Sequence, residues 1–148
     1  MNYVVVANAF DANNHSDLVV DTTSATSQQL AAGDAWLVGF ADSGTLLVYL
    51  DGMDNLLAEG SLKVLALAGG QPSTLTDKAR RVAFDGELVA WFEQEPGEYT
   101  AELKAAALSD PNGVHVLGAD FDGLTVHARF AESRLYVASK EGLWRYGQ

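Results

Sequence analysis

Apolar and polar residues alternate along the chain in short runs, and one arrangement of these runs recurs three times. The three segments are 35–51 (AWLVGFADSGTLLVYLD), 79–94 (ARRVAFDGELVAWFEQ) and 125–142 (TVHARFAESRLYVASKEG). In each, an apolar run ends in phenylalanine, a polar turn follows, and a second apolar run contains an aromatic residue. Apolar runs on both sides of Asp-Gly or Ser-Gly predict a β-hairpin, because glycine adopts the positive φ that tight turns need.

The repeated phenylalanines set the period of the chain. Phe84 follows Phe40 by 44 residues, and Phe130 follows Phe84 by 46 residues. Two further apolar runs fall between successive hairpins: a third strand at 62–67 or 103–108, and a short edge segment ending at Leu75 or Leu117. Four short strands in about 40–45 residues predict one blade of a β-propeller. We expect the three phenylalanines at equivalent buried positions, where they pack one blade against the next.

The predicted strands do not fill whole blades at either end of the chain. Units of about 1–32, 33–76, 77–121 and 122–148 leave the first and the last unit one strand short. The sequence therefore predicts an all-β fold, a β-propeller-like array of four-stranded antiparallel blades that makes an incomplete ring in one chain.

Two segments contain residues that favour a helix, SQQLAAGDAWL (27–37) and AELKAAALSD (101–110). Their position in the period predicts strands instead, because tertiary context overrides weak local propensity.

The pattern resembles the TolB-type β-propeller repeats of the WD-repeat-like superfamily. The matching residues are Phe40, Ser43-Gly44, Leu47-Val48-Tyr49, Leu62, Leu67, Gly69-Gly70 and Leu75 in one unit, and Phe84, Asp85-Gly86, Val89-Ala90-Trp91, Leu103, Leu108, Asn112-Gly113 and Leu117 in the next. The resemblance covers nearly the whole chain and implies a partial propeller of about three to four blade-like units, but no particular activity. The Ser-Pro-Asp-Gly turn of this repeat is absent, as are the Gly-His and Trp-Asp dipeptides of true WD repeats.

The charge of the chain narrows the choice of partners. Its 148 residues include 20 acidic and 9 basic side chains, a formal net charge of −11, and no cysteine. Such a surface repels phosphate backbones and anionic lipids, so we expect neither nucleic acid nor membrane insertion. The start, MNYVVVANAF, lacks the basic and long apolar regions of a signal peptide. The compartment stays open: periplasmic or extracellular if the chain is cut from a longer one, cytoplasmic if Met1 is native.

The residues that could support chemistry form no recognisable catalytic pattern. His15, His115 and His127 are far apart in the sequence and match no metal or triad motif, so we expect structural or surface roles for them. The acidic loops 11–17 (DANNHSD) and 51–55 (DGMDN) contain oxygen ligands that suit calcium but lack EF-hand spacing. The glutamate-rich loop 93–102 could hold a glycosidase carboxylate pair, although a solvated loop is the simpler interpretation. We expect no enzyme activity, no cofactor and no bound metal.

A non-enzymatic protein-interaction or scaffold module is the function that these observations favour. An incomplete ring leaves blade faces and strand edges open, which predicts a homodimer that closes the ring, with another protein as a further partner. Candidate interface residues are Tyr3 near the start of the chain and Trp144, Arg145 and Tyr146 near its end, since Trp, Tyr and Arg are enriched in binding hot spots. The alternatives are a carbohydrate-binding or glycosidase-type propeller with an axial site, or a piece of a larger extracytoplasmic propeller.

Overall fold

The chain is built of antiparallel β-strands. A computed structural model describes residues 3–8, 16–22, 27–54 and 56–147, with side chains described from Asp34 onward, and this part contains no helix. Its strands are β1 (Tyr3–Asn8), β2 (Ser16–Thr22), β3 (Ser27–Phe40), β4 (Leu46–Asp54), β5 (Glu59–Ala66), β6 (Ser73–Phe84), β7 (Leu88–Glu93), β8 (Thr100–Ala107), β9 (Asp110–Asp122), β10 (His127–Ala131), β11 (Arg134–Ser139) and β12 (Gly142–Tyr146). The expected all-β class is confirmed. None of the described segments is a helix that could cross a bilayer.

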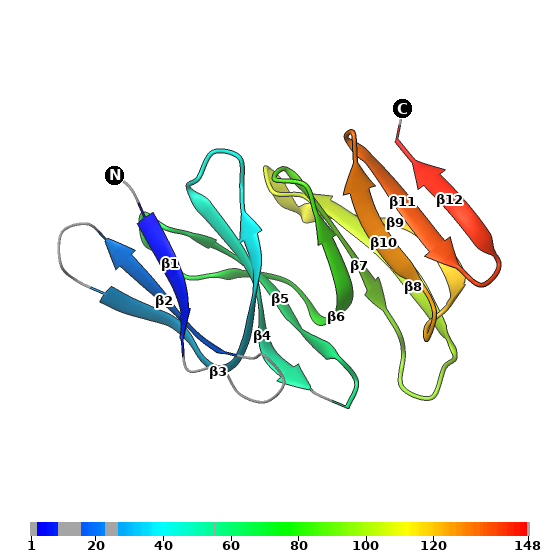
Figure 1. Ribbon diagram of the computed structural model, residues 1–148, viewed down its shortest axis with the longest axis horizontal. Helices are drawn as coiled ribbons and strands as arrows, with labels where there is room; N and C mark the ends of the chain where they lie inside the picture. Colours follow the sequence, from blue (N-terminus) through cyan, green and yellow to red (C-terminus); the bar gives the residue numbers. More distant parts are fainter. Residues whose placement is uncertain (1–2, 9–15, 23–26, 55, 148) are drawn as a thin grey trace. The chain divides into compact units, whose positions relative to one another are not determined.

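Two compact units make up the chain, Met1–Asp77 and Lys78–Gln148. In the first, β1 to β6 follow one another in hydrogen-bonded order, and in the second β6 to β9 do so. The strands β10, β11 and β12 of the second unit form a separate three-stranded sheet (Figure 1). Strand β6 begins in the first unit and ends in the second.

The predicted four-stranded blades are wrong. The predicted edge segment of one unit and the first strand of the next are a single long strand, β3 of 14 residues and β6 of 12 residues. In β3 the half at Ser27–Ala35 pairs with β2, and the half at Trp36–Phe40 pairs with β4. A bulge between Arg80 and Ala83 interrupts the pairing of β6 with β7, in which Arg80 pairs with Phe92 and Ala83 with Ala90. Residues 73–84 contain no glycine or proline that would end a strand. The predicted edge segment and the predicted first strand of the next unit therefore continue as β6.

Both segments with helix-favouring composition are strands, as the period predicts. Residues 27–37 lie in β3, and most of 101–110 lies in β8. In β8, Ala101 and Leu103 are buried while their neighbours Thr100 and Glu102 are exposed. This alternation places one face of β8 in the core, and the burial of that face outweighs the helical preference of alanine.

The core of the second unit lies between two sheets. Buried residues of β7, β8 and β9, among them Phe92, Leu103 and Phe121, form one cluster with Leu135 and Val137 of β11. Figure 1 shows β10 to β12, coloured orange to red, lying across β8 and β9 in this unit. The three-stranded sheet therefore has one face in the core and one face turned away from it.

The expected burial of the three repeated phenylalanines is wrong. Phe40 is 37% exposed, and Phe84 and Phe130 are half-buried. They are equivalent in register, since each pairs with the second residue of the following strand: Leu47 in β4, Val89 in β7 and Leu135 in β11. The buried aromatic residues are two positions further along, Tyr49 at 1% and Trp91 at 0% exposure.

Candidate interaction surface

The three-stranded sheet ends in an open strand edge. Strand β12 pairs with β11, with Gly142 opposite Ser139 at one end and Tyr146 opposite Leu135 at the other. It is the last strand in the order β10-β11-β12. In a hairpin with a two-residue turn, the residues that flank the turn, here Ser139 and Gly142, form a hydrogen-bonded pair. Hydrogen-bonded and non-hydrogen-bonded pairs then alternate along the two strands. The backbone N–H and C=O groups of Leu143 and Arg145 consequently point to the open edge. The Leu143 side chain is 70% exposed at this edge.

The structure separates the four residues that the sequence suggested as an interface. Trp144 faces inward, where its ring meets that of Phe121 edge-on, with centroids 5.4 Å apart and an interplanar angle of 89°. Tyr146 also packs against the core of the second unit, whereas Arg145 is exposed on the other face. Tyr3 begins β1, and its side chain lies outside the described residues. Arg145 is thus exposed, whereas Trp144 and Tyr146 are half-buried.

A largely apolar pocket of about 320 Å³ lies in the second unit. Its walls include Ala106, Leu117 and Phe130, and the more polar His115 and Tyr146. Burial raises the pKa of the Tyr146 hydroxyl, because the phenolate loses hydration there. The lining suits an aliphatic or aromatic side chain, and its volume falls within the range of small ligand sites.

The face of the β10–β12 sheet that is turned away from the core is basic. Arg129 pairs with Tyr136, and Tyr136 pairs with Arg145, so these three residues form one row across the sheet. Because side chains alternate along a strand, the same face also carries the positions two residues away in each strand. We call the following residues the basic face: His127, Arg129, Arg134, Tyr136, Leu143 and Arg145. None of its strand positions holds Asp or Glu.

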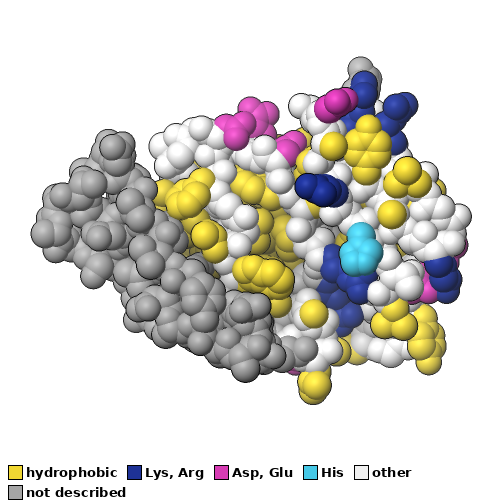
Figure 2. Space-filling model, in the orientation of Figure 1, with side chains coloured by type: hydrophobic (Ala, Val, Ile, Leu, Met, Phe, Trp, Pro, Cys, Tyr) yellow, Lys and Arg dark blue, Asp and Glu magenta, His cyan; other side chains and the backbone are white. Residues whose placement is uncertain are grey.

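Figure 2 shows Lys, Arg and His side chains gathered over the part of the second unit where β10 to β12 lie. In the part of the chain that the structure describes, neither Arg129 nor Arg145 forms an ion pair with a carboxylate. Both side chains are exposed. The two guanidinium groups are therefore available to a partner.

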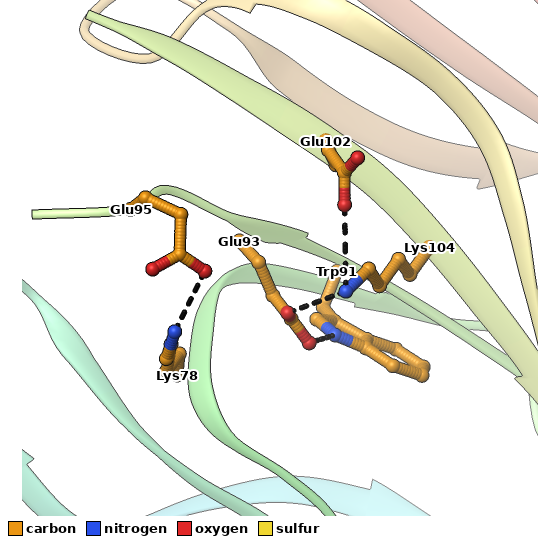
Figure 3. A network of polar contacts seen from close by, with 6 residues as sticks. All are labelled: Lys78, Trp91, Glu93, Glu95, Glu102 and Lys104. Carbon is orange, nitrogen blue, oxygen red and sulfur yellow. Dashed lines mark hydrogen bonds and ion pairs between the residues drawn. The ribbon is translucent and has the colours of Figure 1, made fainter. Parts of the chain in front are cut away.

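A second cluster of charges, on β6, β7, β8 and the loop after β7, is internally satisfied (Figure 3). Glu93 accepts a hydrogen bond from Trp91 Nε1 at 2.8 Å, and its other carboxylate oxygen lies 2.6 Å from Lys104 Nζ. Lys104 also lies 3.5 Å from Glu102, and Lys78 pairs with Glu95 at 2.7 Å. The hydrogen bond that Lys104 donates to Glu93 raises the pKa of Lys104 above its usual value. Three of the four glutamates in loop 93–102, where a glycosidase carboxylate pair was considered, are therefore in ion pairs with lysines.

The first unit repeats this arrangement. Lys63 Nζ lies 2.5 Å from Asp51, next to the buried Tyr49 with which Lys63 pairs across the strands. The hydrogen bond to Asp51 raises the pKa of Lys63, and burial raises that of the Tyr49 hydroxyl. Sequence reasoning missed both clusters. The signal was present as an aromatic residue two positions before an acid (YLD, WFE), followed by Leu-Lys about one hairpin later.

The remaining candidates do not come together in one place. His115 lines the pocket, His127 lies on the basic face, and His15 lies outside the described residues. Asp54 accepts backbone N–H groups of Leu56 and Leu57 at 2.8 and 3.1 Å, which explains the acidic loop as a turn. Loop 11–17 lies mostly outside the described residues. Within the described part, no group of three His, Asp or Glu side chains is arranged to hold a metal ion.

No protein-family model matches the sequence, and a comparison with curated proteins finds no relative.

Proposed function

We propose that the chain is a non-enzymatic protein-interaction module made of β-propeller blades, and that two copies associate as a homodimer that closes a ring. The observation that supports this function is the open edge of β12 in a sheet of three strands. An edge strand with outward N–H and C=O groups is a template for another strand. Strand addition gives affinity through the main chain and specificity through pockets for alternate side chains.

Two features of the fold support the propeller. The hairpins repeat in detail, since Leu67 N–H donates to Thr45 C=O and Leu108 N–H donates to Glu87 C=O, both at 2.9 Å. The sheets of the second unit pack face to face, as successive blades must in order to bury their apolar faces. The ion pairs of Glu93, Glu95 and Glu102 support a structural role for those carboxylates rather than a catalytic one.

The pocket fits the same mode of binding. Tyr146 belongs both to β12 and to the pocket wall. A strand added along β12 would run beside the pocket, so that one of its apolar side chains could enter it. The carbohydrate-binding alternative gains less from this pocket, because most of its lining is apolar.

The oligomeric state of the full chain tests the proposal. We expect light scattering after size-exclusion chromatography to give twice the chain mass of 15.8 kDa at micromolar concentration. Leu143→Pro should shift the chain to monomer, because proline removes an N–H that points to the open edge and breaks no bond to β11. Leu143→Ala is the matched control, which keeps this N–H. A well-folded wild type that stays monomeric would contradict the proposal.

A further inference from the structure

The basic face contrasts with the charge of the whole chain, which is −11. Residues 127–148, which contain the β10–β12 sheet, have four Lys and Arg and two Asp and Glu. Both acids, Glu132 and Glu141, lie in the turns between the strands. A partner that approaches the outer face of this sheet therefore meets positive charge, although the chain as a whole is strongly negative.

Arg145 lies where the basic face meets the open edge of β12. Its side chain is exposed on that face, and its backbone N–H and C=O point to the edge. A strand added antiparallel to β12 would place one residue directly opposite Arg145 on the same face, with the two Cβ atoms about 5 Å apart. Opposite charges stabilise such a pair and like charges destabilise it. Arg145 therefore favours an added strand with an acid at this position.

The core side of β12 favours a different kind of residue. Because side chains alternate along a strand, the neighbours of that acid would lie beside Trp144 and Tyr146. Both of these residues pack against the core of the second unit, and Tyr146 forms part of the wall of the largely apolar pocket. The neighbours of the acid should therefore be apolar.

We propose that β12 selects an extended segment of another protein in which acidic and apolar residues alternate. The proposal rests on the proposed function as an interaction module with an open edge, and it names the chemistry of the partner. The guanidinium of Arg145 binds the carboxylate opposite it, a task that suits arginine because its planar fork donates two parallel hydrogen bonds. The apolar side chains pack on the core side, and one of them enters the pocket.

An acidic peptide suits this edge better than nucleic acid does. The outward N–H and C=O groups of Leu143 and Arg145 match the main chain of another strand, which a nucleic acid does not have. A net charge of −11 also repels a phosphate backbone at long range. A short peptide with a few carboxylates meets the same repulsion, and the main-chain hydrogen bonds offset it.

Two synthetic peptides separate local attraction from overall charge. In EVELEVE glutamate alternates with valine or leucine, and in KVKLKVK lysine replaces each glutamate; both peptides are acetylated and amidated. The net charge of −11 by itself favours the lysine peptide. By isothermal titration calorimetry of the full chain at about 0.1 M salt, we expect EVELEVE to bind at least about tenfold more tightly. The rearranged peptide EEVLVEE, which has the same composition without the alternation, should bind more weakly than EVELEVE.

Substitutions in the chain assign the preference to Arg145. Arg145→Glu should reverse it, whereas Lys78→Glu, which changes the net charge equally but lies outside the basic face, should preserve it. Arg129 lies two strands away from β12, so Arg129→Glu should reduce the preference by less than Arg145→Glu does. At about 1 M salt the preference should shrink, because the Debye length falls from about 10 Å to about 3 Å.

Modified peptides test the strand pairing without changing the protein. In an antiparallel pairing, the glutamates opposite Leu143 and Arg145 exchange main-chain hydrogen bonds with them. N-methylation on the inner glutamates of EVELEVE removes these N–H groups and should abolish binding. N-methylation on the apolar residues is the matched control, because their N–H groups point away from β12. Where two copies already pair through β12, EVELEVE should also shift the dimer toward monomer in light scattering.

The outcomes distinguish this proposal from the proposed self-association. A monomeric wild type that binds EVELEVE as expected overturns the self-association alone. Equal binding of EVELEVE and KVKLKVK, a preference that Arg145→Glu leaves unchanged, or equal effects of the two N-methylations overturns the selection by β12 and leaves the self-association in place. Binding of single-stranded oligothymidylate that Arg145→Glu abolishes, without binding of EVELEVE, would assign the basic face to nucleic acid instead. Circular dichroism and the melting temperature check that each variant folds.

Discussion

The guanidinium of Arg81 donates a hydrogen bond to the backbone carbonyl of Leu124, 43 residues further along the chain, at 2.6 Å. It also donates to the carbonyl of Val126, so one side chain holds the connection between β9 and β10. Arg81 lies at the bulge of β6 with a φ of +50°, a conformation that costs a residue with a side chain about 1–2 kcal/mol. The bulge turns the side chain toward a loop that a regular strand would leave unsupported.

Replacing Arg81 should therefore destabilise the second unit. We expect Arg81→Ala to lower the free energy of unfolding by about 1.5–3 kcal/mol, the usual worth of hydrogen bonds to a charged group, as measured by urea denaturation. Arg81→Gly should recover roughly 0.5–1 kcal/mol of that loss, because glycine adopts the positive φ without strain. If alanine proves the more stable of the two, the backbone at this bulge is not strained.

The ion pair of Lys104 with Glu93 should matter more than that of Lys78 with Glu95. The side chains of the first pair are 21% and 13% exposed, and those of the second pair 42% and 66%. Lys104→Met leaves the Glu93 carboxylate partly buried with its cation removed, at a cost of about 1–3 kcal/mol. Lys78→Met should cost less than about 1 kcal/mol. Urea denaturation of the two variants compares them directly, and equal costs would contradict the assignment.

Stability should fall at alkaline pH. Hydrogen bonds to carboxylates raise the pKa of Lys63 and Lys104 above the usual 10.5, and burial raises that of Tyr49 and Tyr146 above 10.0. A raised pKa in the folded chain means that the unfolded chain releases the proton first. The stabilisation is therefore complete below about pH 10 and is lost as the pH rises through the folded-state values.

The pH dependence can be assigned to one residue by a conservative change. Tyr146→Phe keeps the ring and removes the ionising hydroxyl, so its melting temperature should fall less steeply than that of the wild type above pH 10. Tyr99→Phe is the control, because Tyr99 is 82% exposed. Identical slopes for Tyr146→Phe and wild type would show that this hydroxyl is not protected by burial.

The turn between β10 and β11 offers a stabilising substitution. Glu132 and Ser133 have φ angles of +49° and +57°, the pattern of a type I′ turn, in which Asn-Gly is preferred. Changing both residues to Asn-Gly should raise stability by about 1 kcal/mol, measured as a higher melting temperature. The same change at Lys140-Glu141, where neither φ is positive, should give no gain.

The strands and their turns could be predicted from the sequence, and their continuity was misread. Asp85-Gly86 and Ala41 to Gly44 lie between paired strands, because the turn chemistry is local. A period of four strands per unit divides β6 in two, because the period counts the segment ending at Leu75 and the run ending at Phe84 as separate strands. The absence of a breaker between Ser73 and Phe84 was the better guide.

The faces of the last sheet needed the tertiary structure. In "GLWRYG" both Leu143 and Trp144 are apolar, so alternation alone does not tell which of them faces the core. The contact of Trp144 with Phe121 places Trp144 on the core side of β12. Because side chains alternate along a strand, Arg145 lies on the other side. The partnership of Glu93 with Lys104 likewise depends on the register of β7 and β8. Sequence spacing does not fix that register until the intervening loop is known.

The continuous strand β6 also limits how the chain can be divided or recombined. The boundary between the two compact units, after Asp77, falls inside this strand rather than in a linker. A gene fusion made there would separate the two halves of one strand. Duplication or exchange of a unit would have to cut within a hairpin turn such as Asp85-Gly86. The repeat that can be moved therefore runs from turn to turn and does not coincide with the compact unit.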